Sequence, residues 1–145
     1  MDDRVKKLKT PADCVKFAKN AKALGHGDLV LQANRRAIGL RAEAYGAATD
    51  AERECLEAIY AYEEILSEKN GRRTRASRTW QAIKVRGILA AVERIVDRPD
   101  GTAGFTALQE VGLENFAFEA VVLKHKDLFS ESAVKRSRER MALID

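Results

Sequence analysis

The chain has 145 residues and a net charge of +4, with 46% apolar and 33% charged residues. This length suits one domain with its own core, and the balance of apolar and charged residues excludes a disordered chain. No apolar run approaches the roughly 18 residues of a membrane span, and Met1-Asp2-Asp3-Arg4 lacks the apolar core of a signal peptide. We therefore expect a single domain over residues 1–145, located in the cytoplasm.

The first two predicted helices have recognisable start and stop signals. Thr10-Pro11-Ala12-Asp13 predicts a helix start, because threonine caps a helix and proline is tolerated in the first turn. Gly25-His26-Gly27 ends this helix, since glycine is the common residue after a helix C-terminus. Asp28 is then the expected cap of a second helix, which Gly46 ends.

The third predicted helix is the most acidic part of the chain. Thr49-Asp50-Ala51-Glu52 has the spacing of a capping box, and Asn70-Gly71 closes the helix. Apolar residues recur at helical spacing between these signals. They are Cys55, Ile59, Tyr62 and Leu66.

The second half of the chain also has a helical pattern. A fourth helix is expected from Ser77 to Asp97, followed by a turn at Arg98-Pro99-Asp100-Gly101. Two shorter helices are expected at 102–110 and 114–126, separated by Gly112, and Ser130 caps a polar terminal helix. No stretch has the sustained alternation of a β-strand. The sequence therefore predicts an all-α fold, a compact single-domain bundle of six or seven helices.

The charges lie in blocks of opposite sign. Residues 1–45 carry a net +5. Residues 46–68 carry seven acidic side chains and only Arg53, a net −6. Residues 69–92 carry seven basic side chains and no acidic one, a net +7. Blocks this different along one chain predict a polarised surface.

The strongest candidate site is the basic segment, residues 69–86. Arginine side chains, hydroxyl groups and a helix N-terminus near Ser77 are the groups that contact phosphates. We therefore predict a nucleic-acid-binding module, for DNA in preference to RNA, that contacts phosphates through this segment. The predicted contact residues are Lys69, Arg72, Arg73, Arg75, Arg78, Lys84 and Arg86.

Two alternatives to nucleic-acid binding use the same charges. The acidic helix at 51–68 immediately precedes the basic segment and can neutralise it within the chain. It can also meet the basic segment of a second copy or a protein partner, which would make the protein an interaction module or a homo-oligomer. Trp80 heads the apolar seam of the fourth helix, so we expect it in the core rather than stacked on a base.

The sequence carries no recognised enzyme or cofactor motif, so a non-enzymatic protein without metal or cofactor is favoured. His26 and His125 have no cysteine or carboxylate at a known metal-ligand spacing. Cys14 and Cys55 lie on apolar helix faces and are expected to be buried, reduced thiols. A metal-dependent nuclease or enzyme subunit remains the less favoured alternative, with Glu54, Glu57 and Glu64 as its acids.

Overall fold

The computed structural model describes residues 1–99 and 103–142. Within these ranges it has nine α-helices, two short 3-10 helices and no strand. The predicted all-α class is confirmed, whereas the predicted number of six or seven helices is too low. The chain divides into two compact units, Met1–Ala47 and Ala48–Asp145. The single domain expected over residues 1–145 stays a prediction.

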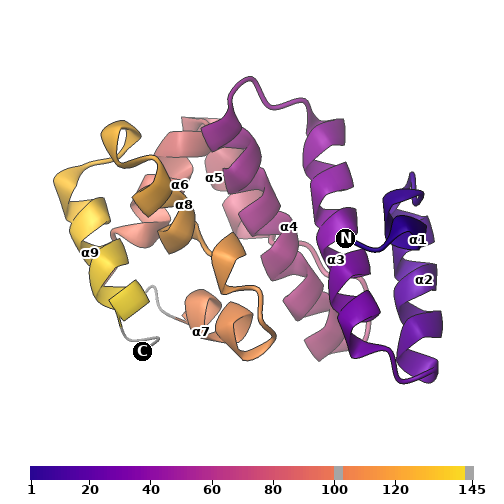
Figure 1. The fold of residues 1–145 in the computed structure, drawn as a ribbon. Coiled ribbons are helices and arrows are strands. Elements are labelled where there is room, and N and C mark those ends of the chain that lie inside the picture. The colour runs from indigo at the N-terminus through magenta and orange to yellow at the C-terminus, as the bar shows by residue number, and fades with distance from the viewer. Residues whose placement is uncertain (100–102, 143–145) are drawn as a thin grey trace. The chain divides into compact units, whose positions relative to one another are not determined.

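The first unit contains α1 (Asp3–Lys6), α2 (Pro11–Ala23) and α3 (Gly27–Tyr45), of which α2 and α3 lie side by side (Figure 1). The predicted start of α2 is confirmed, because the Thr10 hydroxyl accepts the Asp13 N–H at 3.1 Å. The predicted Asp28 cap is wrong. Helix α3 begins at Gly27, and His26 at its N-cap makes no side-chain capping hydrogen bond. Buried side chains of Val5, Ala21 and Leu29 form the centre of this unit.

The second unit begins with α4 (Asp50–Asn70), which has the predicted bounds. The Thr49 hydroxyl accepts the Glu52 N–H at 3.2 Å, as the capping-box spacing predicts. The Glu52 carboxylate then accepts the Thr49 hydroxyl. Gly71 ends the helix in the left-handed conformation, at a φ of 68° that glycine adopts without steric cost.

The predicted fourth helix is two helices, α5 (Ser77–Arg86) and α6 (Ile88–Val96). Gly87 separates them with a φ of 90° and a ψ of 165°, a conformation essentially restricted to glycine. The apolar spacing continues through the break, so the periodic pattern alone does not reveal it. Helices α5 and α6 pack against each other, and α6 also packs on α4.

The rest of the second unit consists of short helices. Helix α7 (Ala103–Glu110) ends at the predicted residue, and Gly112 follows it in the left-handed conformation. A 3-10 turn at Glu114–Phe116 precedes α8 (Phe118–Lys124). The helix expected from residue 114 therefore begins four residues later. A second 3-10 turn (Lys126–Leu128) leads to α9 (Glu131–Ala142), where the Ser130 hydroxyl accepts the Ala133 N–H as the predicted cap. The predicted turn at 98–101 lies partly outside the described residues.

The core of the second unit joins α4, α6, α8 and α9. Helices α8 and α9 pack closely (Figure 1), and their apolar side chains meet those of α4 and α6. The buried side chains at its centre are Cys55, Ala58, Val92, Val96, Val121, Val122, Phe129, Ala133 and Val134. No helix in the described part of the chain is long and apolar enough to cross a membrane.

Both cysteines are free and buried, which confirms their prediction as structural thiols. Cys14 lies in α2 and Cys55 in α4. Burial raises the pKa of the Cys55 thiol to about 12, and the nearby Glu54 and Glu52 carboxylates add to this effect. A thiol with this pKa is not a nucleophile at neutral pH.

Candidate functional site

All seven predicted contact residues have exposed side chains within the second unit. Lys69 lies in the last turn of α4, and Arg72, Arg73 and Arg75 lie in the connector, residues 71–76 between α4 and α5. The other three lie on α5. They are Arg78, Lys84 and Arg86.

The connector is fixed to the end of α4 by hydrogen bonds. The Gly71 N–H bonds the Glu68 carbonyl at 3.3 Å and the Arg72 N–H bonds the Ser67 carbonyl at 3.2 Å, the pair of bonds that defines a Schellman turn. The Ser67 hydroxyl accepts the Thr74 N–H at 2.8 Å and donates to the Thr74 carbonyl at 3.2 Å. The Thr74 hydroxyl accepts from the Asn70 side-chain amide at 3.1 Å. The arginines of the connector therefore project from an ordered backbone.

Glu63 is the buried anchor of this arrangement, with only 3% of its surface exposed. One carboxylate oxygen, Oε2, accepts the Ala76 N–H at 2.8 Å and the Trp80 indole N–H at 2.7 Å. The same carboxylate lies 3.8 Å from the Arg75 guanidinium. Since a buried carboxylate requires hydrogen-bond donors, Glu63 ties the end of the connector and the start of α5 to α4.

Trp80 is part of this anchor. Its ring lies 5.3 Å from that of Tyr60 at a tilt of 51°, and the Arg75 guanidinium lies 5.4 Å from its centroid. The indole is half-buried and hydrogen-bonded to Glu63. These contacts use the ring for packing, in agreement with its predicted structural role.

The acidic helix neutralises part of the basic segment within the chain. Arg73 pairs with Glu64 at 2.7 Å, and Arg75 pairs with Glu63. These two ion pairs correspond to the alternative in which the acidic helix, rather than a ligand, neutralises cations of the basic segment. Among residues 1–99 and 103–142, the other five cations of the segment have no ion pair.

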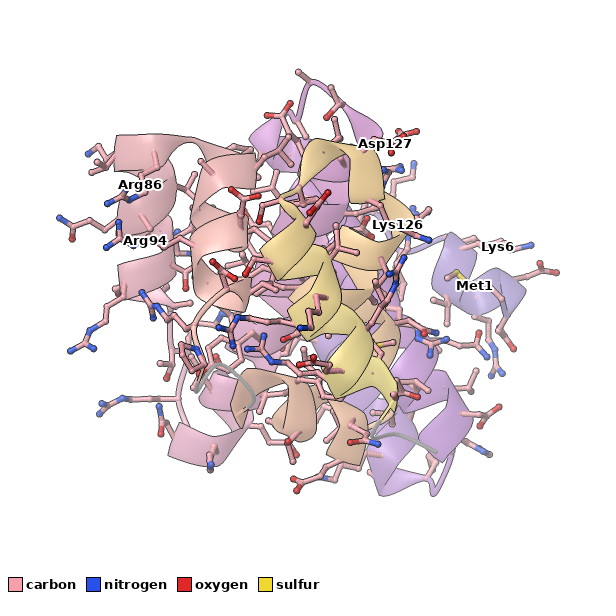
Figure 2. All side chains as sticks on the ribbon, turned by 90° about the vertical axis from the view of Figure 1, so that its left-hand side faces the viewer. Met1, Lys6, Arg86, Arg94, Lys126 and Asp127 are labelled. Atoms are coloured by element: carbon pink, nitrogen blue, oxygen red, sulfur yellow. The ribbon has the colours of Figure 1, made fainter. Side chains whose placement is uncertain are left out.

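The break at Gly87 adds a cation that the sequence did not indicate. Arg94 is exposed on α6, and Figure 2 shows Arg86 and Arg94 projecting on the same side of the molecule. A continuous helix from Ser77 to Asp97 would have carried Arg94 farther along the axis. The glycine in the helical pattern is the only sequence signal for this arrangement.

The second basic cluster, residues 135–140, is partly used inside the fold. Arg140 is buried and donates to the Glu119 carboxylate at 3.0 Å and to the Val96 carbonyl at 2.7 Å. Arg136 pairs with Asp97 at 3.2 Å. Hydrogen bonds from Ser132 and Arg136 hold the pKa of Asp97 below its usual value of 3.8 despite the opposing effect of desolvation. Two of the four cations here therefore hold α9 against the turn after α6.

The acids proposed for a metal site have other partners. The Glu54 carboxylate contacts Lys124 and His125, so His125 has a carboxylate neighbour that its sequence surroundings did not reveal. Burial by itself raises the pKa of Glu54, but the hydrogen bonds from Lys124 and His125 outweigh it and leave that pKa below 4.5. Burial raises the pKa of Glu57. No group of three or more His, Cys, Asp or Glu side chains able to hold a metal ion occurs within the described ranges.

No protein-family model, curated protein or solved structure matches this chain.

Proposed function

We propose that this chain is a nucleic-acid-binding module that contacts phosphates through the basic segment, with DNA as the favoured ligand and the cytoplasm as the expected location. The observation that carries the proposal is the absence of any ion pair for five of its seven exposed cations within the described residues. Cations without a nearby carboxylate keep their full attraction for a polyanion, and binding releases the counterions condensed on it.

The connector and α5 have different parts in this proposal. Arg73 and Arg75 hold the connector against α4 through their ion pairs, so they shape the surface more than they bind a phosphate. Arg78, Lys84 and Arg86 are exposed on α5, and Arg94 of α6 projects on the same side of the molecule as Arg86 (Figure 2). Lys84 and Arg86 lie in the last turn of α5, where cations also stabilise the helix dipole. Stabilisation of the helix dipole by Lys84 and Arg86 would be the same if each had an acidic partner, so it does not explain why they have no ion pair within the described residues.

The contacts are expected to be with the backbone of the nucleic acid rather than with its bases. Contacts from arginine and lysine to phosphate oxygens carry no sequence information, and the segment's only tryptophan is engaged with Glu63 and Tyr60. Binding should therefore depend steeply on salt and weakly on sequence.

The direct test is fluorescence anisotropy of labelled random-sequence duplex DNA, titrated at several salt concentrations. If four or five cations neutralise phosphates, the logarithm of the association constant should fall with the logarithm of salt with a slope of about −4. A slope near zero, or no binding at low salt, would refute the proposal. A single strand and an RNA duplex of equal length, measured in parallel, determine the preferred ligand.

The alternative is a homo-oligomer in which the acidic helix of one copy meets the basic segment of another. It is less favoured because Glu63 and Glu64 already have arginine partners in their own chain. Light scattering at low and high salt separates the two ideas, since only the oligomer predicts a dimer that dissociates as salt rises.

A further inference from the structure

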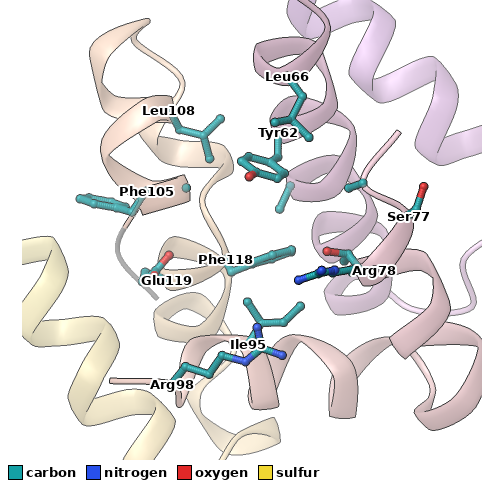
Figure 3. A pocket seen from close by; sticks show the side chains of 14 residues that line it. Tyr62, Leu66, Ser77, Arg78, Ile95, Arg98, Phe105, Leu108, Phe118 and Glu119 are labelled. Carbon is teal, nitrogen blue, oxygen red and sulfur yellow. The ribbon is translucent and has the colours of Figure 1, made fainter. Parts of the chain in front are cut away.

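The second unit contains a pocket of about 430 Å³ that shares only Arg78 with the predicted phosphate-contacting residues (Figure 3). Its walls come from α4, the start of α5, the end of α6, α7 and α8. Tyr62, Phe105, Leu108 and Phe118 give it a largely apolar and aromatic surface, of which Phe105 and Leu108 are buried. The volume lies in the range of small-molecule sites, which are about 300–1,000 Å³.

Two arginines supply the positive charge of the pocket. Figure 3 shows the Arg78 guanidinium pointing toward Phe118, and the Arg98 guanidinium directed at the same part of the pocket near Ile95. Arg78 comes from the first turn of α5, whereas Arg98 follows the end of α6. Neither side chain has an ion pair among the residues the structure describes. Two unpaired guanidinium groups beside an apolar cavity attract an anion.

The one acid in the lining does not cancel this charge. Glu119 is buried and accepts a hydrogen bond from the equally buried Arg140 at 3.0 Å, so its carboxylate already has a cation of its own. Desolvation raises the pKa of Glu119, against the lowering effects of a backbone hydrogen bond and of Arg140. The pocket therefore combines apolar walls with a net positive opening.

We propose that this pocket binds a small organic acid, with an aromatic or aliphatic body against Tyr62, Leu108 and Phe118 and a carboxylate between Arg78 and Arg98. Burial of the body removes apolar surface from water, and the carboxylate replaces bulk water as the partner of the two guanidinium forks. Charge and apolar surface are both required, because a neutral body would leave the arginines without a partner. This site is independent of phosphate binding by Lys84 and Arg86, which do not line the pocket.

The proposal is tested with three probe acids of different shape: 2-naphthoate, decanoate and phenyl phosphate. Isothermal titration calorimetry gives the affinity of each, and amide chemical shifts in NMR spectra locate the bound probe. At least one carboxylate should bind roughly tenfold more tightly than its neutral carboxamide, with shifts concentrated at residues lining the pocket. Failure of all three probes to bind at millimolar concentration would overturn the proposal, and so would equal binding of an acid and its amide.

Matched variants test the role of the two arginines. Arg78→Gln and Arg98→Gln should each weaken the bound carboxylate roughly tenfold, the effect of losing one charge-assisted contact. Arg138→Gln removes an exposed cation from α9 outside the lining and should leave the affinity unchanged. Tighter binding of phenyl phosphate than of both carboxylates would overturn the choice of head group. An equal loss of affinity in all three arginine variants would mean that the net charge of the protein alone attracts the acid, and would refute a specific site between Arg78 and Arg98.

Discussion

The connector and α5 carry the same kind of charge but use it differently. In the connector, Arg73 and Arg75 pair with carboxylates of α4, and the backbone is held by Ser67, Thr74 and Glu63. On α5, the cations have no ion pair within the described residues. The difference follows from position, because Arg73 and Arg75 lie within 4 Å of Glu64 and Glu63, whereas no carboxylate of the described residues lies that close to the cations of α5. A run of basic residues therefore contains both structural and available cations, and composition does not distinguish them.

The largest expected effect comes from breaking the anchor of the connector. Glu63→Ala leaves the Ala76 N–H and the Trp80 indole N–H without their buried acceptor, so the free energy of unfolding should fall by about 3 kcal/mol. Urea unfolding measures this change. Glu68→Ala, at an exposed position of the same helix, should change it by less than about 0.5 kcal/mol. Equal effects of the two substitutions would mean that Glu63 does not hold the connector.

A smaller effect is expected where α5 meets α6. Gly87→Ala places a side chain at a φ of 90° and a ψ of 165°, which should cost about 2 kcal/mol of stability. Apart from the two neighbouring residues in the chain, no described atom lies within 4 Å of the added methyl group, so the expected cost is backbone strain. Gly39→Ala, in the middle of α3 with equal space around it, should instead stabilise the protein by up to about 1 kcal/mol. If Gly87→Ala stabilised the protein, residues 77–97 would form one continuous helix. Arg94 would then not lie on the same side of the molecule as Arg86.

The smallest effect is expected for the exposed ion pair of the connector. Arg73→Gln removes the contact with Glu64, in which the arginine is 47% exposed, so the free energy of unfolding should fall by less than about 1 kcal/mol. The same urea titrations measure it. A loss as large as that of Glu63→Ala would contradict the assignment of Glu63 as the main anchor.

Much of the helical framework was predictable from local signals. Thr10 and Thr49 cap α2 and α4, and Gly46 and Gly71 end α3 and α4, because caps and left-handed glycines act within one helical turn. Gly87 was missed because apolar spacing runs across it without interruption.

The candidate site was predictable in composition but not in arrangement. Glu63 follows Cys55 and Ile59 at intervals of four residues, so helical spacing alone places it on the buried face of α4. The spacing was overlooked because Glu63 is a glutamate in a helix with many other acidic residues, which are usually exposed. The pocket could not have been foreseen, since Tyr62, Arg78, Arg98 and Phe118 come together only through tertiary packing.

The most direct test of the central claim compares two double variants of equal charge in the DNA anisotropy titration. Lys84→Gln/Arg86→Gln removes two cations that have no ion pair in the described part of the chain, and Arg73→Gln/Arg75→Gln removes two that are paired. We predict that the α5 pair lowers the magnitude of the salt slope by about 2 and weakens binding at least tenfold, while the connector pair changes the slope by less than about 1. Equal changes in the two variants, or a larger change in the connector pair, would contradict the distinction between structural and available cations.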